Sequence, residues 1–204
     1  MKKLIRIGLL LGLILLMAQS AWALPIQQND WVNLKTSPND DFKYEMTNIN
    51  THDDWSSYYT FCLESQVRFY SSWDYRVESV SDYAKGNYGY DKVSDETKWL
   101  YASNMEGLFG SGLKDKLQSA IWWLEGEVGG LEADWDYFDD NYDSYGYDTT
   151  GWDIKAINIV DKWGRDSQSQ LVGEYNPVPE PATMILFGIG LLGIAGMGRK
   201  KTKV

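Results

Sequence analysis

The run Tyr58-Tyr59-Thr60-Phe61-Cys62-Leu63 is a compact series of aromatic, β-branched and aliphatic residues, and it predicts a buried strand. Alternation of apolar and polar residues with a period of two predicts further strands on both sides of it. These lie at 42–46, 67–69, 73–77 and 152–160, with 168–175 as a further candidate and a loop rich in Gly, Asn and Tyr at 85–90.

In the middle of the chain the hydrophobic period changes to that of a helix. Ser94-Asp95-Glu96 offers an N-cap and two first-turn acids, which predicts a helix that ends near Glu106, before three closely spaced glycines. Apolar residues at helical spacing predict a second helix, which ends near Gly126. They are Leu113, Leu117, Ile121 and Leu124. The order of elements therefore predicts an α+β fold: a β-rich antiparallel sheet or barrel domain with two short helices.

Residues 134–148, with the sequence DWDYFDDNYDSYGYD, are rich in acidic and aromatic residues and are predicted to form a loop. Carboxylate oxygens are ligands that calcium prefers. The candidate calcium ligands are Asp134, Asp136, Asp139, Asp140 and Asp143. Their spacing lacks the alternate positions, central Gly and closing Glu of an EF-hand. The sequence therefore predicts no cofactor, with calcium at this acidic loop as an open alternative to simple solvation.

The N-terminus has the features of a secretory signal peptide. Three basic residues precede an apolar stretch at 7–17, and Ala21 and Ala23 form an A-x-A cleavage site. Residues 1–23 are therefore predicted to be removed on export, so they take no part in the fold.

The C-terminal segment 177–204 contains the tripeptide Pro179, Glu180 and Pro181. An uncharged apolar run at 182–198 follows, and four basic residues close the chain. The run is long enough to cross most of a bilayer core as a transmembrane helix, with its basic end in the cytoplasm. A simple membrane anchor is one interpretation of this segment.

The order of tripeptide, apolar span and basic end resembles the PEP-CTERM sorting signal of Gram-negative bacteria. The resemblance implies a precursor anchored in the inner membrane and recognition by an exosortase-type sorting protease. It also implies a mature form at the cell surface or in the extracellular matrix, often in the company of exopolysaccharide.

Residues 24–176 remain as one predicted extracytoplasmic domain, and this domain is strongly acidic. It holds 12 Lys and Arg residues against 28 Asp and Glu residues, a formal charge of −16. Such a charge repels nucleic acid, so the sequence excludes a nucleic-acid partner. Nine of the ten Trp and all 14 Tyr residues also lie here, and they supply area for a core and flat faces for sugar rings.

The chain contains a single cysteine, so it cannot form an internal disulfide. Cys62 lies in Phe61-Cys62-Leu63-Glu64, and Gln118 lies in 117–122, LQSAIW. With Trp99-Leu100-Tyr101 between them, these strings resemble the thioester domains of bacterial surface adhesins and a group of PEP-CTERM proteins. Leu117 replaces the Thr that is usual in the adhesin motif.

The resemblance implies an internal thioester between Cys62 and Gln118, which an outside amine or hydroxyl attacks once. The alternative is structural. A free cysteine is often a small buried apolar residue, and Gln118 would then be an amide on a helix surface.

The sequence contains no conventional catalytic set, because His52 is its only histidine and no G-x-S-x-G elbow is present. We therefore expect a non-enzymatic, exported binding or structural protein of the cell surface or exopolysaccharide matrix. Its expected partners are an exosortase and a polysaccharide or protein ligand, with adhesion through the thioester. The alternative is a secreted hydrolase acting on polysaccharide, although no carboxylate pair stands out as its acid and base.

Overall fold

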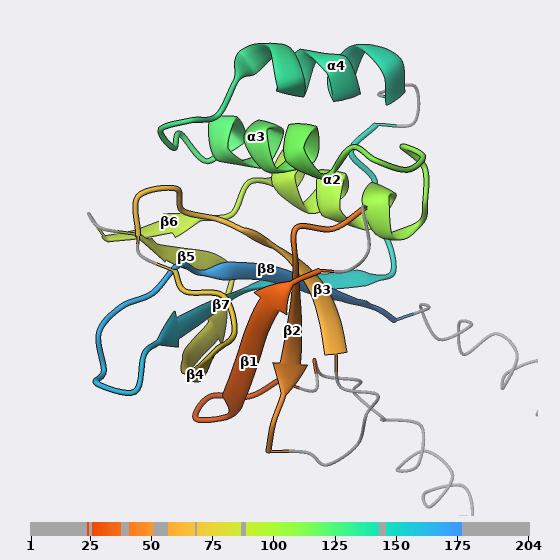
Figure 1. Ribbon diagram of the computed structural model, residues 1–204. Helices are drawn as coiled ribbons and strands as arrows, with labels where there is room; N and C mark the ends of the chain where they lie inside the picture. The colour runs from red at the N-terminus through yellow and green to blue at the C-terminus, as the bar shows by residue number, and fades with distance from the viewer. Residues whose placement is uncertain are drawn as a thin grey trace, which may run out of the picture.

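Six antiparallel strands close into a barrel (Figure 1). The computed structural model describes residues 24, 26–37, 41–50, 57–67, 69–86, 89–142 and 146–176. The barrel strands are β1 (Trp31–Thr36), β2 (Tyr44–Asn48), β3 (Ser57–Cys62), β4 (Trp73–Ser81), β7 (Trp152–Val160) and β8 (Gln170–Tyr175). Their order around the barrel is β1-β2-β3-β8-β7-β4, and each neighbouring pair is antiparallel.

The barrel strands contribute to two separate apolar clusters. One cluster fills the barrel interior: Leu24, Ile26, Val32, Leu34, Met46, Tyr75, Val77, Ile157, Ile159 and Val172. The other lies under the helices and includes Phe61, Ile154, Ala156 and Leu171. Because successive side chains of a strand point to opposite faces, β7 and β8 are buried on both faces. This double burial explains why residues 152–160 read as an almost continuous apolar run.

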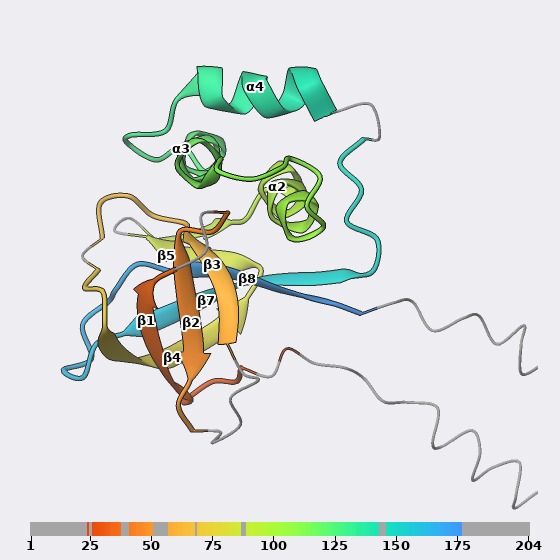
Figure 2. The same cartoon turned by 45° about the vertical axis from the view of Figure 1, so that its right-hand side comes forward.

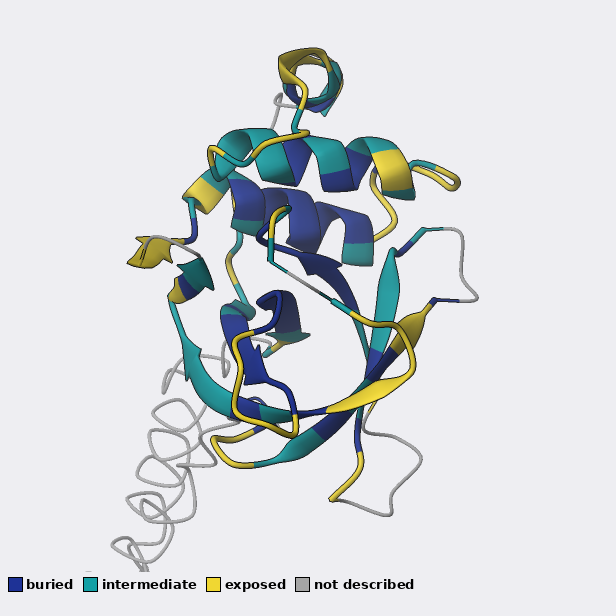
Figure 3. Ribbon diagram, turned by 60° about the vertical axis from the view of Figure 1, so that its left-hand side comes forward, coloured by how far each residue is buried: buried dark blue, intermediate teal, exposed yellow. Residues whose placement is uncertain are grey.

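The helices form two layers on one side of the barrel (Figure 2). They are α2 (Asp95–Met105), α3 (Lys114–Leu124) and α4 (Glu132–Tyr142). Helix α2 packs against β7 and β8, α3 lies beside α2, and α4 packs on α3 as the outer layer. Helix α2 is largely buried as a result (Figure 3). At its centre Trp99 meets Phe109, Trp135 and Tyr147 edge-on, so aromatic rings fill the space between the layers.

Both helices expected from the sequence are confirmed. The Ser94 hydroxyl accepts a hydrogen bond from the Thr97 backbone N–H at 3.1 Å, as an N-cap does. Gly107 and Gly126 adopt φ values of 75° and 72° just after the two helices, a conformation that is inexpensive for glycine. The strand at 152–160 is confirmed with the same bounds, and the antiparallel barrel confirms the α+β expectation.

The prediction of only two helices was wrong, because α4 occupies much of the predicted acidic loop. Trp135 and Phe138 are its buried residues, and their spacing of three places both on the face toward α3. Glu132 and Asp134 lie in its first turn, where the helix dipole favours negative charge. The density of acids obscured this apolar stripe in the sequence.

Three smaller expectations also differ from the structure. The predicted loop at 85–90 is a hairpin of β5 (Tyr83–Gly86) and β6 (Gly89–Lys92). Val67 and Phe69 lie in a loop, where the Phe69 ring packs between aromatic rings instead of pairing in a strand. The first barrel strand, β1, was not predicted; its Val32 and Leu34 point inward and alternate with polar residues.

The predicted signal peptide at 1–23 and the sorting segment at 177–204 lie outside the described residues. Within the described ranges, no helix combines the length and the apolar character that a membrane crossing requires. The domain bounds 24–176 stay a prediction.

Candidate functional site

Cys62 is the last residue of β3, and only 1% of it is exposed. Gln170, the first residue of β8, is its direct partner across the strand pair. The Gln170 Nε2 atom donates a hydrogen bond to Cys62 Sγ at 3.3 Å, and the Tyr44 hydroxyl also bonds to the sulfur. The thiol therefore faces two polar groups from the strands on either side of β3.

Gln118 reaches the same residue from helix α3, but it binds the backbone. The Cys62 N–H donates to Gln118 Oε1 at 2.9 Å, and Gln118 Nε2 donates to the Cys62 carbonyl at 2.7 Å. The register of β2 and β3 ends at Tyr44 and Thr60, so β2 does not pair with Cys62. The Gln118 carboxamide supplies the two hydrogen bonds that a longer β2 would have made.

The structure thus brings the two predicted residues together and adds a third that the sequence reasoning missed. No described contact joins Cys62 Sγ to Gln118, whereas the sulfur contacts Gln170. The available signal was Gln170-Leu171-Val172, in which an amide alternates with Val172 on the inward face of the strand. A buried amide in such a position needs a polar partner.

Burial raises the pKa of the Cys62 thiol to about 12, although the hydrogen bond from Gln170 works in the opposite direction. The negative charge of Glu64 adds to the increase, while Lys43 and Tyr44 lower it. The thiol is therefore protonated at neutral pH. Its surroundings protect it from oxidation, since the reactive species of a cysteine is the thiolate.

Glu64 is a buried acid two residues beyond Cys62, with an exposed fraction of 3%. Burial raises its pKa to about 7, and hydrogen bonds from Ser169 and the nearby charge of Glu127 act with smaller effect. One carboxylate oxygen accepts from the Ser169 N–H, and the other, Oε1, has no partner among the described residues. Glu64 is therefore a buried carboxyl group with a raised pKa, and it is hydrogen-bonded to the backbone next to Gln170.

The four calcium candidates that the structure describes do not converge into a site. Asp134 lies on α4 and pairs with Lys116 at 3.2 Å, while the Asp139 carboxylate accepts from the Tyr147 hydroxyl at 2.7 Å. Asp136 and Asp140 are exposed on the same helix. Asp143 lies outside the described residues, as do His52 and the Pro179-Glu180-Pro181 tripeptide. In the part of the chain that the structure describes, no three His, Cys, Asp or Glu side chains are grouped to hold a metal ion.

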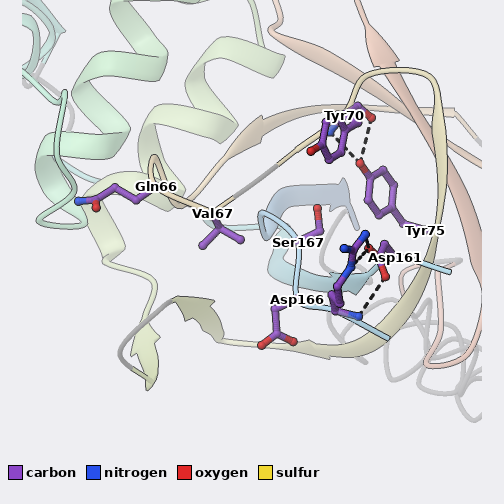
Figure 4. Close-up of a pocket in the computed structure, with 8 residues that line it drawn as sticks. Gln66, Val67, Tyr70, Tyr75, Asp161, Asp166 and Ser167 are labelled. Atoms are coloured by element: carbon purple, nitrogen blue, oxygen red, sulfur yellow. Dashed lines mark hydrogen bonds and ion pairs between the residues drawn. The ribbon is translucent and has the colours of Figure 1, made fainter. Parts of the chain in front are cut away.

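A second candidate site is a pocket of about 270 Å³ at the end of the barrel where β7 finishes and β4 begins (Figure 4). The Tyr75 hydroxyl lies in its wall, where it accepts from the Tyr70 N–H at 2.8 Å and donates to the Tyr70 carbonyl at 2.9 Å. Asp161 forms an ion pair with Arg165 at 2.6 Å in the same wall. Barrel mouths that carry a few convergent polar groups are common ligand sites.

Comparison with known proteins identifies one segment of the chain. Residues 177–200 match the family model described as PEP-CTERM protein-sorting motif. No curated protein and no solved structure matches the chain. The resemblance of the C-terminus to the PEP-CTERM sorting signal is thereby confirmed. The bounds 177–204 and the membrane-spanning helix stay predictions. The likeness of the barrel domain to adhesin thioester domains stays a prediction.

Proposed function

We propose, from the premise that residues 177–200 carry a PEP-CTERM protein-sorting motif, that the barrel domain is a surface-binding module that attaches covalently through an internal thioester of Cys62. The motif implies export, a membrane-anchored precursor and processing by an exosortase. The polysaccharide or protein ligand, and the covalent step itself, belong to the proposal.

The observation that carries the proposal is the contact of 3.3 Å between Gln170 Nε2 and Cys62 Sγ. The carbon that a thiol would attack is bonded directly to this nitrogen, so the two reacting groups are neighbours before any chemistry begins. Proximity of this kind supplies much of the rate of intramolecular reactions. It favours Gln170 as the acyl donor over Gln118, because the Gln170 amide contacts the sulfur whereas the Gln118 amide contacts the Cys62 backbone.

The proposed reaction exchanges one bond for another. The sulfur of Cys62 attacks the side-chain carbonyl carbon of Gln170, a carbon–sulfur bond forms, and the carbon–nitrogen bond breaks. Ammonia leaves with the proton that the thiol gives up. A later amine or hydroxyl of the ligand takes the acyl group, and the thiol is regenerated with the proton of that nucleophile.

The surroundings of the pair suit a bond that water must not reach. Cys62 and Gln170 are both almost fully buried. The Tyr44 ring contacts the Phe69 ring at 4.8 Å, and these side chains pack against the interior cluster on the barrel side of the sulfur. Exclusion of water slows hydrolysis of a reactive acyl group.

Intact mass of the full chain purified from its host tests the proposal. A thioester lowers the mass by one ammonia, about 17 Da, and leaves no thiol to titrate in freshly unfolded protein. Methylamine should restore the thiol and add its own mass. A normal mass together with one titratable thiol would contradict the covalent part of the proposal.

Two matched variants identify the acyl donor. Gln170→Leu should abolish the mass deficit, as Cys62→Ala does, whereas Gln118→Leu should keep it wherever the protein still folds. Tandem mass spectrometry of the linked peptides names the glutamine directly. A link to Gln118 would overturn our assignment of the donor and restore the pair expected from the sequence.

A further inference from the structure

Three large aromatic side chains are exposed together at the mouth of the barrel. They are Tyr70, Trp73 and Trp163, and Trp163 is 58% exposed. The Tyr70 and Trp73 rings stack at 4.5 Å, and the Trp73 and Trp163 rings lie 5.9 Å apart. They come from the loop before β4, the start of β4 and the turn after β7. Contiguous exposed apolar groups of this kind mark interaction sites on soluble proteins. We call this trio the aromatic ridge.

The turn that carries Trp163 is held in one conformation by Asp161. The Asp161 Oδ1 atom accepts from the backbone N–H of Trp163 at 2.8 Å and of Arg165 at 3.0 Å. Its Oδ2 atom binds the Arg165 guanidinium at 2.6 and 2.7 Å. The guanidinium in turn lies 4.6 Å from the Trp163 ring. A ridge that is rigid before binding loses little conformational entropy when a ligand arrives.

Hollows lie on both sides of the ridge. Tyr70 lines the pocket of about 270 Å³ shown in Figure 4, and Trp73 lines a second one of about 360 Å³ with Asp74 and Lys162. Because Tyr70 and Trp73 stack on each other, their rings separate the two hollows. An extended ligand could cross the ridge and place groups on both sides of it.

The charges around the pocket are already paired. Asp161 pairs with Arg165, and Asp166 pairs with Lys85 at 2.8 Å. Glu78 shares Lys85 with Asp166, at 2.6 Å, so this group keeps a net negative charge. The pocket therefore offers hydrogen-bond donors and acceptors, and both cations of the group are already held by carboxylates, so it does not attract an anionic ligand. The domain charge of −16 opposes an anionic chain. A neutral ligand with one apolar face and many hydroxyl groups fits these surroundings.

We propose that the aromatic ridge binds a neutral polysaccharide chain. The C–H face of a sugar ring lies on the exposed indole, and its hydroxyl groups enter the hollows on either side. The inference rests on the proposed surface-binding function, since it names the ligand class and the surface that recognises it. It does not depend on Cys62, whose side chain faces the barrel interior and is not part of the ridge.

Affinity electrophoresis of the full chain tests this assignment. Gels contain dextran, galactomannan, xyloglucan or the host's own exopolysaccharide, with alginate as the anionic comparison. At least one neutral polymer should retard the protein, at low and at high salt. Trp163→Ala should weaken the retardation about tenfold or more, and Trp163→Phe should keep part of it. Tyr90→Ala removes an aromatic side chain that is equally exposed on β6 and should change nothing.

Each other outcome overturns the proposal. Retardation by alginate alone would assign the ridge to an anionic ligand. No retardation in any gel, or full retardation of a folded Trp163→Ala variant, would remove the ridge from sugar binding. Capture by a proline-rich peptide column in the absence of retardation would assign it to a protein ligand. Cys62→Ala separates the two proposals, because it should lose the thioester mass deficit and keep the retardation.

Discussion

The surroundings of Cys62 and the aromatic ridge lie at the same end of one barrel, yet they are built in opposite ways. Cys62 and Gln170 are buried and bonded to each other, whereas Trp163 is the most exposed tryptophan of the described residues. A short line of rings separates them: Phe69 lies 4.8 Å from Tyr44, which bonds to the sulfur, and 6.0 Å from Tyr75, which lines the pocket. The comparison teaches that a buried, water-excluded pair (Cys62 and Gln170) and a solvent-exposed recognition surface (the aromatic ridge) can lie at one end of a barrel when a layer of aromatic rings separates them.

The largest effect on stability is expected from Gln118→Leu, which tests the buried surroundings of Cys62. The variant leaves the Cys62 N–H and carbonyl buried without partners, and each such group costs about 1–3 kcal/mol. We expect the free energy of unfolding in urea to fall by about 2–4 kcal/mol. Gln28→Leu is the matched control, because that amide is exposed. An unchanged midpoint for Gln118→Leu would mean that the amide does not support β3.

Glu64, which is buried close to Cys62, should make the free energy of unfolding depend on pH. Its pKa is about 7 in the folded protein against 4.5 as the ordinary value, so between these limits the folded state holds a proton that the unfolded state has lost. The free energy of unfolding should therefore decrease as pH rises from about 4.5 to 7, by up to about 1.4 kcal/mol per pH unit, and then level off.

Glu64→Gln should remove this slope, and urea titrations at pH 5, 6, 7 and 8 measure it. Asp140→Asn, which changes an exposed carboxylate on α4, serves as the control for net charge. A slope that persists in Glu64→Gln would place the titrating group elsewhere in the molecule.

Phe69→Ala should remove the aromatic layer that separates Cys62 from the pocket beside the aromatic ridge. Removal of the middle ring opens a route from the pocket to Cys62, so reagents should reach the sulfur about tenfold faster, which corresponds to about 1.4 kcal/mol. The measurement is the rate of thiol labelling where the thiol is free, or of methylamine uptake where it is acylated. Tyr83→Ala, an exposed aromatic on the hairpin, should leave the rate unchanged. Equal rates for Phe69→Ala and the parent would contradict a barrier at this position.

The smallest effect on stability is expected from a substitution in the exposed aromatic ridge. Trp163→Ala removes an exposed ring whose main neighbours are Trp73, Lys162 and Arg165. We therefore expect the free energy of unfolding, measured by thermal unfolding, to fall by less than about 1 kcal/mol. A loss as large as that of Gln118→Leu would show that the ridge is a structural core and would weaken its assignment as a recognition surface.

Local sequence signals located most elements because those signals act over a few residues. Ser94 predicted the start of α2 through its capping hydroxyl, and the apolar run at 152–160 predicted β7. The same reasoning failed for α4, where Trp135 and Phe138 are the only buried residues among many acids. At the candidate site, the motif named Cys62 and placed Gln118 near it, but it did not distinguish a backbone contact from a contact with the sulfur.

The sequence by itself determined the C-terminal sorting motif, the acidity of the domain and the kind of most helices and strands. It did so because periodicity, caps and charge are read along the chain. The tertiary structure alone decided that Gln170 meets the thiol and that Tyr70, Trp73 and Trp163 form one ridge. Gln170 lies 108 residues from Cys62, and Trp163 lies 90 residues from Trp73. Only the strand order and register of the closed barrel bring these distant partners together.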